Sequence, residues 1–111
     1  MTLSAAEAQR IFDEADPVVS EQDSALAVRR VAGEIADALS GAHPLVLSVM
    51  GGAVIFTGQL LPLLHFPLEF DYLHVTRYRG AIVGSGLAWL HRPSTPLEGR
   101  RVIIADDILD E

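Results

Sequence analysis

Two short runs of residues without any charged side chain place the strongest constraint on how this chain folds. They are Leu45 to Val49, with the sequence LVLSV, and Val102 to Ala105, with the sequence VIIA. A strand that has one face in water alternates polar and apolar residues, whereas a strand covered on both faces is apolar almost throughout. The two runs therefore predict an α/β domain, in which helices flank a largely parallel, twisted sheet.

Capping residues predict helices ahead of this sheet. Ser4 and Glu7 have the spacing of a capping box, in which each side chain accepts a backbone N–H that the helix leaves free. Ser20 can cap a second helix in a similar way. We expect leading helices over residues 4–40 and the sheet region over residues 44–111, all within a single domain.

Between the two apolar runs, turn residues divide the chain into further elements. The pattern predicts a helix over 53–64 and strands over 68–78 and 86–91, with a glycine-containing loop over 79–85 between these strands. A turn-rich connection over 93–99 then leads to the last strand.

The composition excludes several classes of function. The formal net charge is −7, which disfavours binding to the phosphate backbone of a nucleic acid. The chain has no Cys, so disulfides and thiolate metal sites are excluded and a cytoplasmic location is expected. We expect no membrane partner, because no apolar stretch approaches the roughly 20 residues of a membrane span. Half of the residues are hydrophobic, which favours packing against another subunit or within a longer chain.

Four acidic residues lie within the last six positions: Asp106, Asp107, Asp110 and Glu111. They follow the apolar run VIIA directly, and ligands of open α/β sheets bind at the carboxyl ends of the strands. Neighbouring carboxylates repel each other unless a cation or a polyol binds them. The pattern is that of a cation or sugar site, and the N-terminus of an acidic helix is the alternative that the spacing leaves open.

A glycine pair, Gly51 and Gly52, follows the other apolar run and precedes the predicted helix. Because glycine has no side chain, backbone N–H groups at such a pair can approach an anion closely. An ordinary turn at the end of a strand is the alternative for this pair.

Four stretches of the chain, taken in order, resemble hypoxanthine-guanine phosphoribosyltransferases of the type I phosphoribosyltransferase family. They are DEADPVVSE, SVMGGAVIFTGQLLPLL, FPLEFDYLHVTRYRG and VIIADDILDE. The last is similar to the family's signature for phosphoribosyl pyrophosphate. The resemblance implies a type I phosphoribosyltransferase fold, with residues 1–111 as the N-terminal portion of a single domain that stops before the C-terminal half.

The resemblance also implies a role for each acidic residue. Asp106, Asp107 and Glu111 would bind the ribose of phosphoribosyl pyrophosphate, and Asp110 would exchange a proton with N7 of a purine base. Mg²⁺ on the pyrophosphate is the implied cofactor, with Asp106 and Asp107 as its candidate ligands. Such carboxylates would also stabilise the positive charge that develops on the sugar as pyrophosphate leaves.

Two further stretches acquire roles from the resemblance. The family's pyrophosphate-binding loop is matched by Val49, Met50, Gly51 and Gly52. A cis peptide bond is expected within it, between Val49 and Met50. The stretch TRYRG resembles the loop that closes over the active site, where Tyr78 would shield the reacting centre from water. Arg77 would contact pyrophosphate, in its own subunit or in a neighbouring one, and the alternative for this stretch is an exposed strand end with solvated arginines.

The implied reaction transfers a 5-phosphoribosyl group from phosphoribosyl pyrophosphate to hypoxanthine or guanine, which yields IMP or GMP and pyrophosphate in purine salvage. The alternatives are a phosphoribosyltransferase for another base, a non-catalytic regulator of the same fold that senses phosphoribosyl pyrophosphate, and an unrelated Mg²⁺-dependent phosphotransfer domain. In the family, the 5′-phosphate turn and the groups that recognise the base come after the position of Glu111. We therefore expect the 111 residues by themselves to be inactive. The family and the apolar composition also imply a homodimer or homotetramer.

Overall fold

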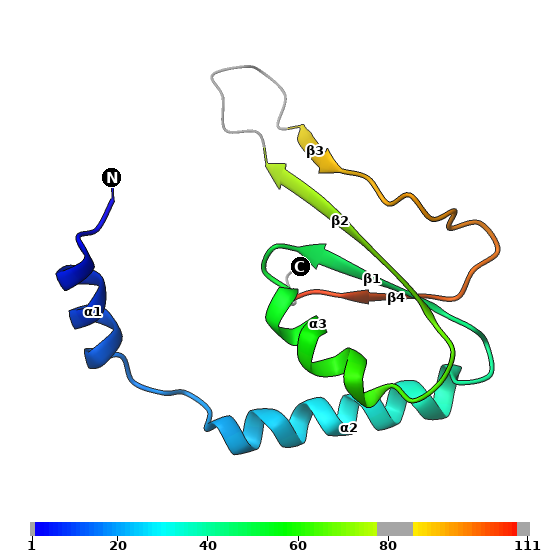
Figure 1. Cartoon of the computed structure of the whole chain (residues 1–111), viewed down its shortest axis with the longest axis horizontal. Coiled ribbons are helices and arrows are strands. Elements are labelled where there is room, and N and C mark those ends of the chain that lie inside the picture. The colour runs from blue at the N-terminus through cyan, green and yellow to red at the C-terminus, as the bar shows by residue number, and fades with distance from the viewer. Residues whose placement is uncertain (1, 78–85, 109–111) are drawn as a thin grey trace.

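The computed structural model describes residues 2–77 and 86–108, which contain a four-stranded sheet (Figure 1). The strand order is β3-β2-β1-β4, and the strands are β1 (Leu45–Met50), β2 (Glu69–Arg77), β3 (Leu87–His91) and β4 (Val102–Ala105). β1 runs parallel to both of its neighbours, whereas β3 pairs antiparallel with β2. The largely parallel sheet of an α/β domain, predicted from the sequence, is confirmed.

Within the described residues the helices are α1 (Ala5–Glu14), α2 (Glu21–Leu39) and α3 (Val54–Leu60), with a 3₁₀ turn after α3 at Leu61–Leu63. Both predicted N-caps are present. The side chain of Ser4 accepts the N–H of Glu7 at 3.1 Å, and Ser20 caps α2 in the same way at 3.0 Å. The helix predicted over 53–64 differs in its last turn, because Pro62 has no N–H with which to continue the α-helical hydrogen bonds.

The hydrophobic core lies between one face of the sheet and the helices α2 and α3. Its buried side chains come from both layers: Val28, Ala32, Val46, Leu60 and Leu64. On the opposite face of β1, Leu45 and Leu47 are buried as well. β1 is therefore covered on both faces, as its LVLSV sequence predicts.

β4 departs from the same prediction. Ile103 packs partly buried against the core, but Ile104, which points to the other face, is 65% exposed. β4 is the edge strand of the described sheet and pairs with β1 alone. Since α2 and α3 both pack on the face of Ile103, the opposite face of β4 has no helical cover among the described residues.

α1 takes no part in this core. It lies apart from the sheet in Figure 1 and buries none of its side chains, so Ile11 and Phe12 are exposed. None of the described helices combines the length and the hydropathy that crossing a membrane requires.

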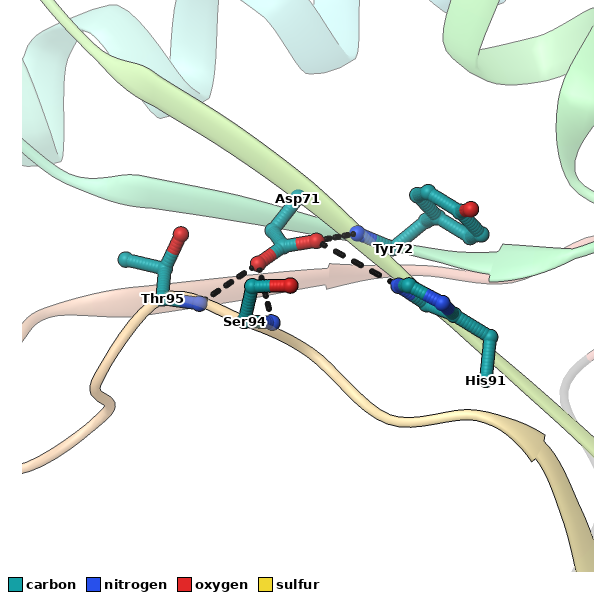
Figure 2. A network of polar contacts seen from close by, with 5 residues as sticks. All are labelled: Asp71, Tyr72, His91, Ser94 and Thr95. Atoms are coloured by element: carbon teal, nitrogen blue, oxygen red, sulfur yellow. Dashed lines mark hydrogen bonds and ion pairs between the residues drawn. The ribbon is translucent and has the colours of Figure 1, made fainter.

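A buried carboxylate holds the connection between β3 and β4 against β2 (Figure 2). Asp71 is only 8% exposed. It accepts hydrogen bonds from the backbone N–H groups of Ser94 at 2.8 Å and Thr95 at 2.7 Å. A third bond comes from the N–H of Tyr72, also at 2.7 Å. The ring of His91 stacks on that of Tyr72 at 3.9 Å between centroids, and its Nε2 lies 4.0 Å from Oδ1 of the carboxylate.

These donors stabilise the ionised form of Asp71. The hydrogen bond from the N–H of Thr95 is the largest influence, and it holds the pKa of the Asp71 carboxyl below its ordinary value. Burial acts in the opposite direction, and the hydrogen bonds taken together outweigh it.

Asp71→Asn is expected to lower the free energy of unfolding by about 2 kcal/mol at neutral pH. The amide offers one acceptor oxygen where the carboxylate offers two, so one of the three partly buried N–H donors loses its partner. Urea unfolding of parent and variant measures the difference. Asp37→Asn on the exposed surface of α2 is the control and should stay within about 0.5 kcal/mol of the parent. Equal stability of Asp71→Asn and the parent would contradict the role given to this carboxylate.

The lowered pKa of Asp71 also predicts how this difference depends on pH. A carboxylate with a lowered folded-state pKa contributes stability in full above its ordinary pKa of about 3.9, and that contribution is lost as the pH falls through the folded-state value. The difference between parent and Asp71→Asn should therefore be constant from about pH 7 to 5 and shrink below about pH 4. Unfolding curves across this range are the measurement, and a difference that grows on acidification would refute the assignment.

Candidate functional site

The carboxyl ends of β1 and β4 lie side by side, at the edge of the sheet where its parallel strands end. The glycine pair and the acidic pair found in the sequence follow these two strand ends. The register pairs Ser48 of β1 with Ala105 of β4. After these paired residues, β1 continues to Gly51 and Gly52, and β4 leads directly to Asp106 and Asp107. Parallel pairing therefore places the glycine pair and the acidic pair side by side at the carboxyl edge.

Gly52 and Asp107 are in close contact across this edge. A carbon atom built at the Cβ position of Gly52 would lie 2.6 Å from Cγ and 2.9 Å from Oδ1 of Asp107. Carbon atoms in favourable contact are about 3.5–4.0 Å apart, so a side chain at this position would displace the carboxylate. The same construction at Gly51 meets nothing within 4 Å. Of the two glycines, Gly52 is the one whose missing side chain leaves room for the Asp107 carboxylate.

A cleft of about 400 Å³ opens beside this contact. Gly52, Asp106 and Asp107 line it at the edge of the sheet, and α2 and α3 contribute Ser24, Val28, Ile55, Phe56 and Gln59. Both aspartates are exposed, so their carboxylates are accessible to a ligand in the cleft. A second cavity, of about 230 Å³, lies farther along α2 and α3 and includes neither aspartate.

Backbone hydrogen bonds close the turn that joins β1 to α3. The N–H of Ala53 donates to the carbonyl of Val49 at 3.1 Å, and the N–H of Val54 donates to the carbonyl of Gly51 at 3.2 Å. The chain therefore reverses within the segment predicted to bind pyrophosphate.

The cis peptide bond of this turn lies between Met50 and Gly51, so the predicted position between Val49 and Met50 is wrong by one residue. β1 is one residue longer than the run LVLSV, because Met50 still pairs with His74 of β2. The peptide before Met50 therefore belongs to the extended strand, and the change of direction comes after it.

Sequence reasoning missed two hydroxyl groups behind the turn. Ser48 of β1 and Thr57 of α3 are both buried, and Oγ of the first lies 2.8 Å from Oγ1 of the second. A signal was present, because Ser48 is the single polar residue of LVLSV and Thr57 is the single hydroxyl residue of α3. Asp71 was missed as well, since two of its three hydrogen-bond donors, Ser94 and Thr95, lie more than 20 residues away in the sequence.

The donor set at the edge fits a magnesium ion that arrives with a phosphate ligand. Mg²⁺ prefers oxygen ligands and commonly uses one or two carboxylates, with water and phosphate oxygens at its other positions. Asp106 and Asp107 supply such carboxylates, and Oδ1 of Asp106 already accepts the N–H of Asp107 at 2.8 Å. Within residues 2–77 and 86–108, no cluster of three or more His, Cys, Asp or Glu side chains could hold a metal. The two carboxylates therefore suit a Mg²⁺ ion that also keeps phosphate and water ligands.

Several predicted site residues lie outside the part of the chain that the structure describes: Tyr78, Asp110 and Glu111, together with the loop predicted over 79–85. The backbone of Arg77 ends β2, three residues past His74, which pairs with the last residue of β1. Arg77 therefore lies beyond the same edge of the sheet, and its side chain is outside the described part. The structure thus brings Val49, Met50, Gly51, Gly52, Asp106 and Asp107 together at one edge.

Gly52→Ala is expected to move the carboxylate of Asp107 by about 1 Å, since a Cβ atom needs that much more room. Because this side chain is exposed and can swing into solvent, the free energy of unfolding should change by less than about 1 kcal/mol. A crystal structure of the variant measures the displacement, and urea unfolding measures the stability. Gly58→Ala in α3 is the matched control, because a Cβ there meets nothing within 4 Å. An unmoved Asp107 in Gly52→Ala would contradict the contact.

The chain is similar to known proteins over most of its length. A family model described as the phosphoribosyl transferase domain matches residues 15–111. The hypoxanthine-guanine-xanthine phosphoribosyltransferase of Tritrichomonas foetus is 32% identical over 101 residues, which are 90% of this chain and 55% of that protein. The hypoxanthine-guanine phosphoribosyltransferase of Streptococcus agalactiae is 33% identical over 92 residues, which are 82% of this chain and 51% of that protein. The chain spans about half the length of the curated relatives it matches.

Solved structures show the same fold. A hypoxanthine phosphoribosyltransferase from Staphylococcus aureus superposes with a TM-score of 0.75 at 16% identity, over 86% of this chain and 53% of that one. At this identity the likeness bears on the fold alone, and it confirms the predicted type I phosphoribosyltransferase fold. With the family model matched from residue 15 to residue 111, the chain belongs to the phosphoribosyl transferase domain family.

Proposed function

We propose that the protein containing this chain transfers a 5-phosphoribosyl group from phosphoribosyl pyrophosphate to hypoxanthine or guanine. The products are IMP or GMP and pyrophosphate, so the reaction serves purine salvage. The proposal rests on the contact of Gly52 with Asp107, which lie together at one cleft. Gly52 belongs to the segment 49–52, the candidate pyrophosphate loop, and Asp107 belongs with Asp106 to the candidate ribose site. Membership of the phosphoribosyl transferase domain family supports the assignment of phosphoribosyl transfer to that cleft.

The two aspartates at the end of β4 bind the sugar in this proposal. Asp106 and Asp107 accept hydrogen bonds from the ribose hydroxyl groups, and Glu111 assists them. As pyrophosphate leaves, positive charge develops at the anomeric carbon and the ring oxygen, and fixed carboxylates beside the ring stabilise it. Asp110 exchanges a proton with N7 of the purine, which is the general acid–base step of the reaction.

The turn between β1 and α3 binds pyrophosphate through its backbone. Val49, Met50, Gly51 and Gly52 carry no charged side chain, so N–H groups are what this segment can offer to phosphate oxygens. Arg77 supplies positive charge to the pyrophosphate, and Tyr78 shields the reacting centre from water. Asp106 and Asp107 would hold Mg²⁺, which neutralises charge on the leaving pyrophosphate when bound.

The choice of base rests on the named relatives. Both of the curated relatives described above have hypoxanthine and guanine in their names, whereas xanthine appears in only one. The other proposals carried over from the sequence are a cytoplasmic location and a homodimer or homotetramer. A regulator that binds phosphoribosyl pyrophosphate without catalysis is the second candidate, and Asp110 disfavours it because a sensor has no need of a proton-transfer group.

Asp110→Asn is the variant that tests the catalytic assignment. In the full-length protein, purine-dependent release of pyrophosphate should fall by roughly 100-fold or more in kcat, because the amide cannot exchange the N7 proton. A coupled pyrophosphate assay with hypoxanthine and with guanine is the measurement. Asp37→Asn, an exposed change on α2, is the control and should turn over like the parent.

Each outcome of this assay has a distinct meaning. Near-normal turnover of Asp110→Asn would remove that residue from proton transfer. Turnover with another base in place of hypoxanthine and guanine would overturn the base assignment. Binding of phosphoribosyl pyrophosphate without turnover for any base would favour the regulator. The 111 residues by themselves are expected to form no nucleotide, and nucleotide formation by them would contradict that expectation.

A further inference from the structure

Two buried hydroxyl groups lie directly behind the turn that joins β1 to α3. Ser48 is 0% exposed and Thr57 is 4% exposed, and their side-chain oxygens are 2.8 Å apart. Their sequence neighbours on the same core face, Val46 and Leu60, are apolar core residues. A polar pair at this depth is satisfied only because each hydroxyl is the other's partner.

The pair spans the candidate pyrophosphate loop. Ser48 precedes Met50 by two residues, and Thr57 follows Gly52 by five, so one hydrogen bond joins the strand before the loop to the helix after it. The backbone continues this connection, since the N–H of Thr57 donates to the carbonyl of Ala53 at 2.9 Å. Ala53 in turn is held to the carbonyl of Val49 at 3.1 Å.

The same pair is linked to the acidic side of the site. Ser48 is paired in register with Ala105, the residue directly before Asp106. On the other side of the loop, Gly52 touches the carboxylate of Asp107. The Ser48–Thr57 hydrogen bond thus joins α3 to the strand beside β4, and Gly52, in the turn between β1 and α3, lies against Asp107 at the end of β4.

We infer that Ser48 and Thr57 are positioning residues, whose hydrogen bond fixes the backbone of the pyrophosphate loop and thereby sets the affinity for the pyrophosphate group of the substrate. The inference rests on the proposed function. Its physical basis is that residues 49–53 (VMGGA) have no charged side chain, so binding there depends on where the backbone N–H groups point. A small shift of α3 would move the N–H groups of Gly51, Gly52 and Ala53, which join β1 to this helix.

A merely structural role predicts a different pattern of mutant effects. Replacing both members of a buried hydrogen-bonded pair by apolar groups of similar shape is nearly neutral for stability, whereas removing one leaves the other unsatisfied. The double variant Ser48→Ala/Thr57→Val therefore removes the hydrogen bond while keeping a filled core. Thr57→Ser does the reverse, because it keeps the hydroxyl and loses a buried methyl group.

The experiment measures steady-state kinetics of these variants in the full-length protein, with their melting temperatures. In the double variant, the KM for phosphoribosyl pyrophosphate and the inhibition constant of pyrophosphate should both rise roughly five- to tenfold, the KM for the purine staying within about twofold. Thr57→Ser should keep near-parent affinity for pyrophosphate in spite of a lower melting temperature. Unchanged pyrophosphate constants in a folded double variant, or an equal rise for Thr57→Ser, would overturn the inference.

A second measurement separates this inference from the proposed function. Backbone amide resonances of Gly51, Gly52 and Ala53 report the loop geometry whether or not the protein turns over a purine. They should shift in the double variant and stay near their parent positions in Thr57→Ser. A parent protein without transferase activity would remove the proposed function, and unshifted loop resonances in the double variant would remove the positioning role.

Discussion

Parallel pairing between β1 and β4 governs where the candidate binding groups of this chain lie. Both strands run in the same direction and pair Ser48 with Ala105, so the chain leaves the sheet twice at the same edge. A shift of one residue in that register would turn every β4 side chain to the opposite face. Ile103 would then leave the core, and Asp107 would leave Gly52. The apolar contacts of α2 and α3 with the sheet thus fix the register and, through it, the site.

Small side chains at this edge let the backbones approach each other. Ala53 and Ala105 are buried on either side of the turn, and Gly52 has no Cβ where the Asp107 carboxylate lies. Ser48 is hardly larger than alanine, and its hydroxyl forms a hydrogen bond with that of Thr57. A bulky residue at one of the buried positions, Ser48, Ala53 or Ala105, would disturb the packing of α3 on the sheet, since a close-packed interior has little room to adjust. Close approach is what allows an uncharged loop and a charged strand end to share one cleft.

The sequence was sufficient for features that depend on neighbours in the chain. The capping box of Ser4, the cap of Ser20 and the apolar run of β1 are local patterns, and each corresponds to an observed element. The distant partners of Asp71 could not be predicted, because they depend on how separate elements pack. Ser48 and Thr57 stand out as hydroxyl residues in apolar elements, but that they are partners depends on packing as well. The predicted position of the cis peptide bond was wrong for a similar reason, since the length of β1 is set by its pairing with β2. The exposed face of β4 likewise depends on which elements cover the sheet.

Apart from the Ser48–Thr57 pair, the side-chain hydrogen bonds that join separate elements of the described residues lie away from the cleft. Asp71 binds the β3–β4 connection, and Arg100 bridges Glu69 at 2.6 Å and the carbonyl of His43 at 2.9 Å near the opposite edge of the sheet. Asp106 and Asp107 differ in kind, because two exposed carboxylates next to each other repel and add to a net charge of −7. A cation or a sugar bound between the carboxylates relieves this repulsion, and by linkage any ligand that does so stabilises the folded state. The adjacent exposed carboxylates therefore support the proposal that a ligand binds at the end of β4.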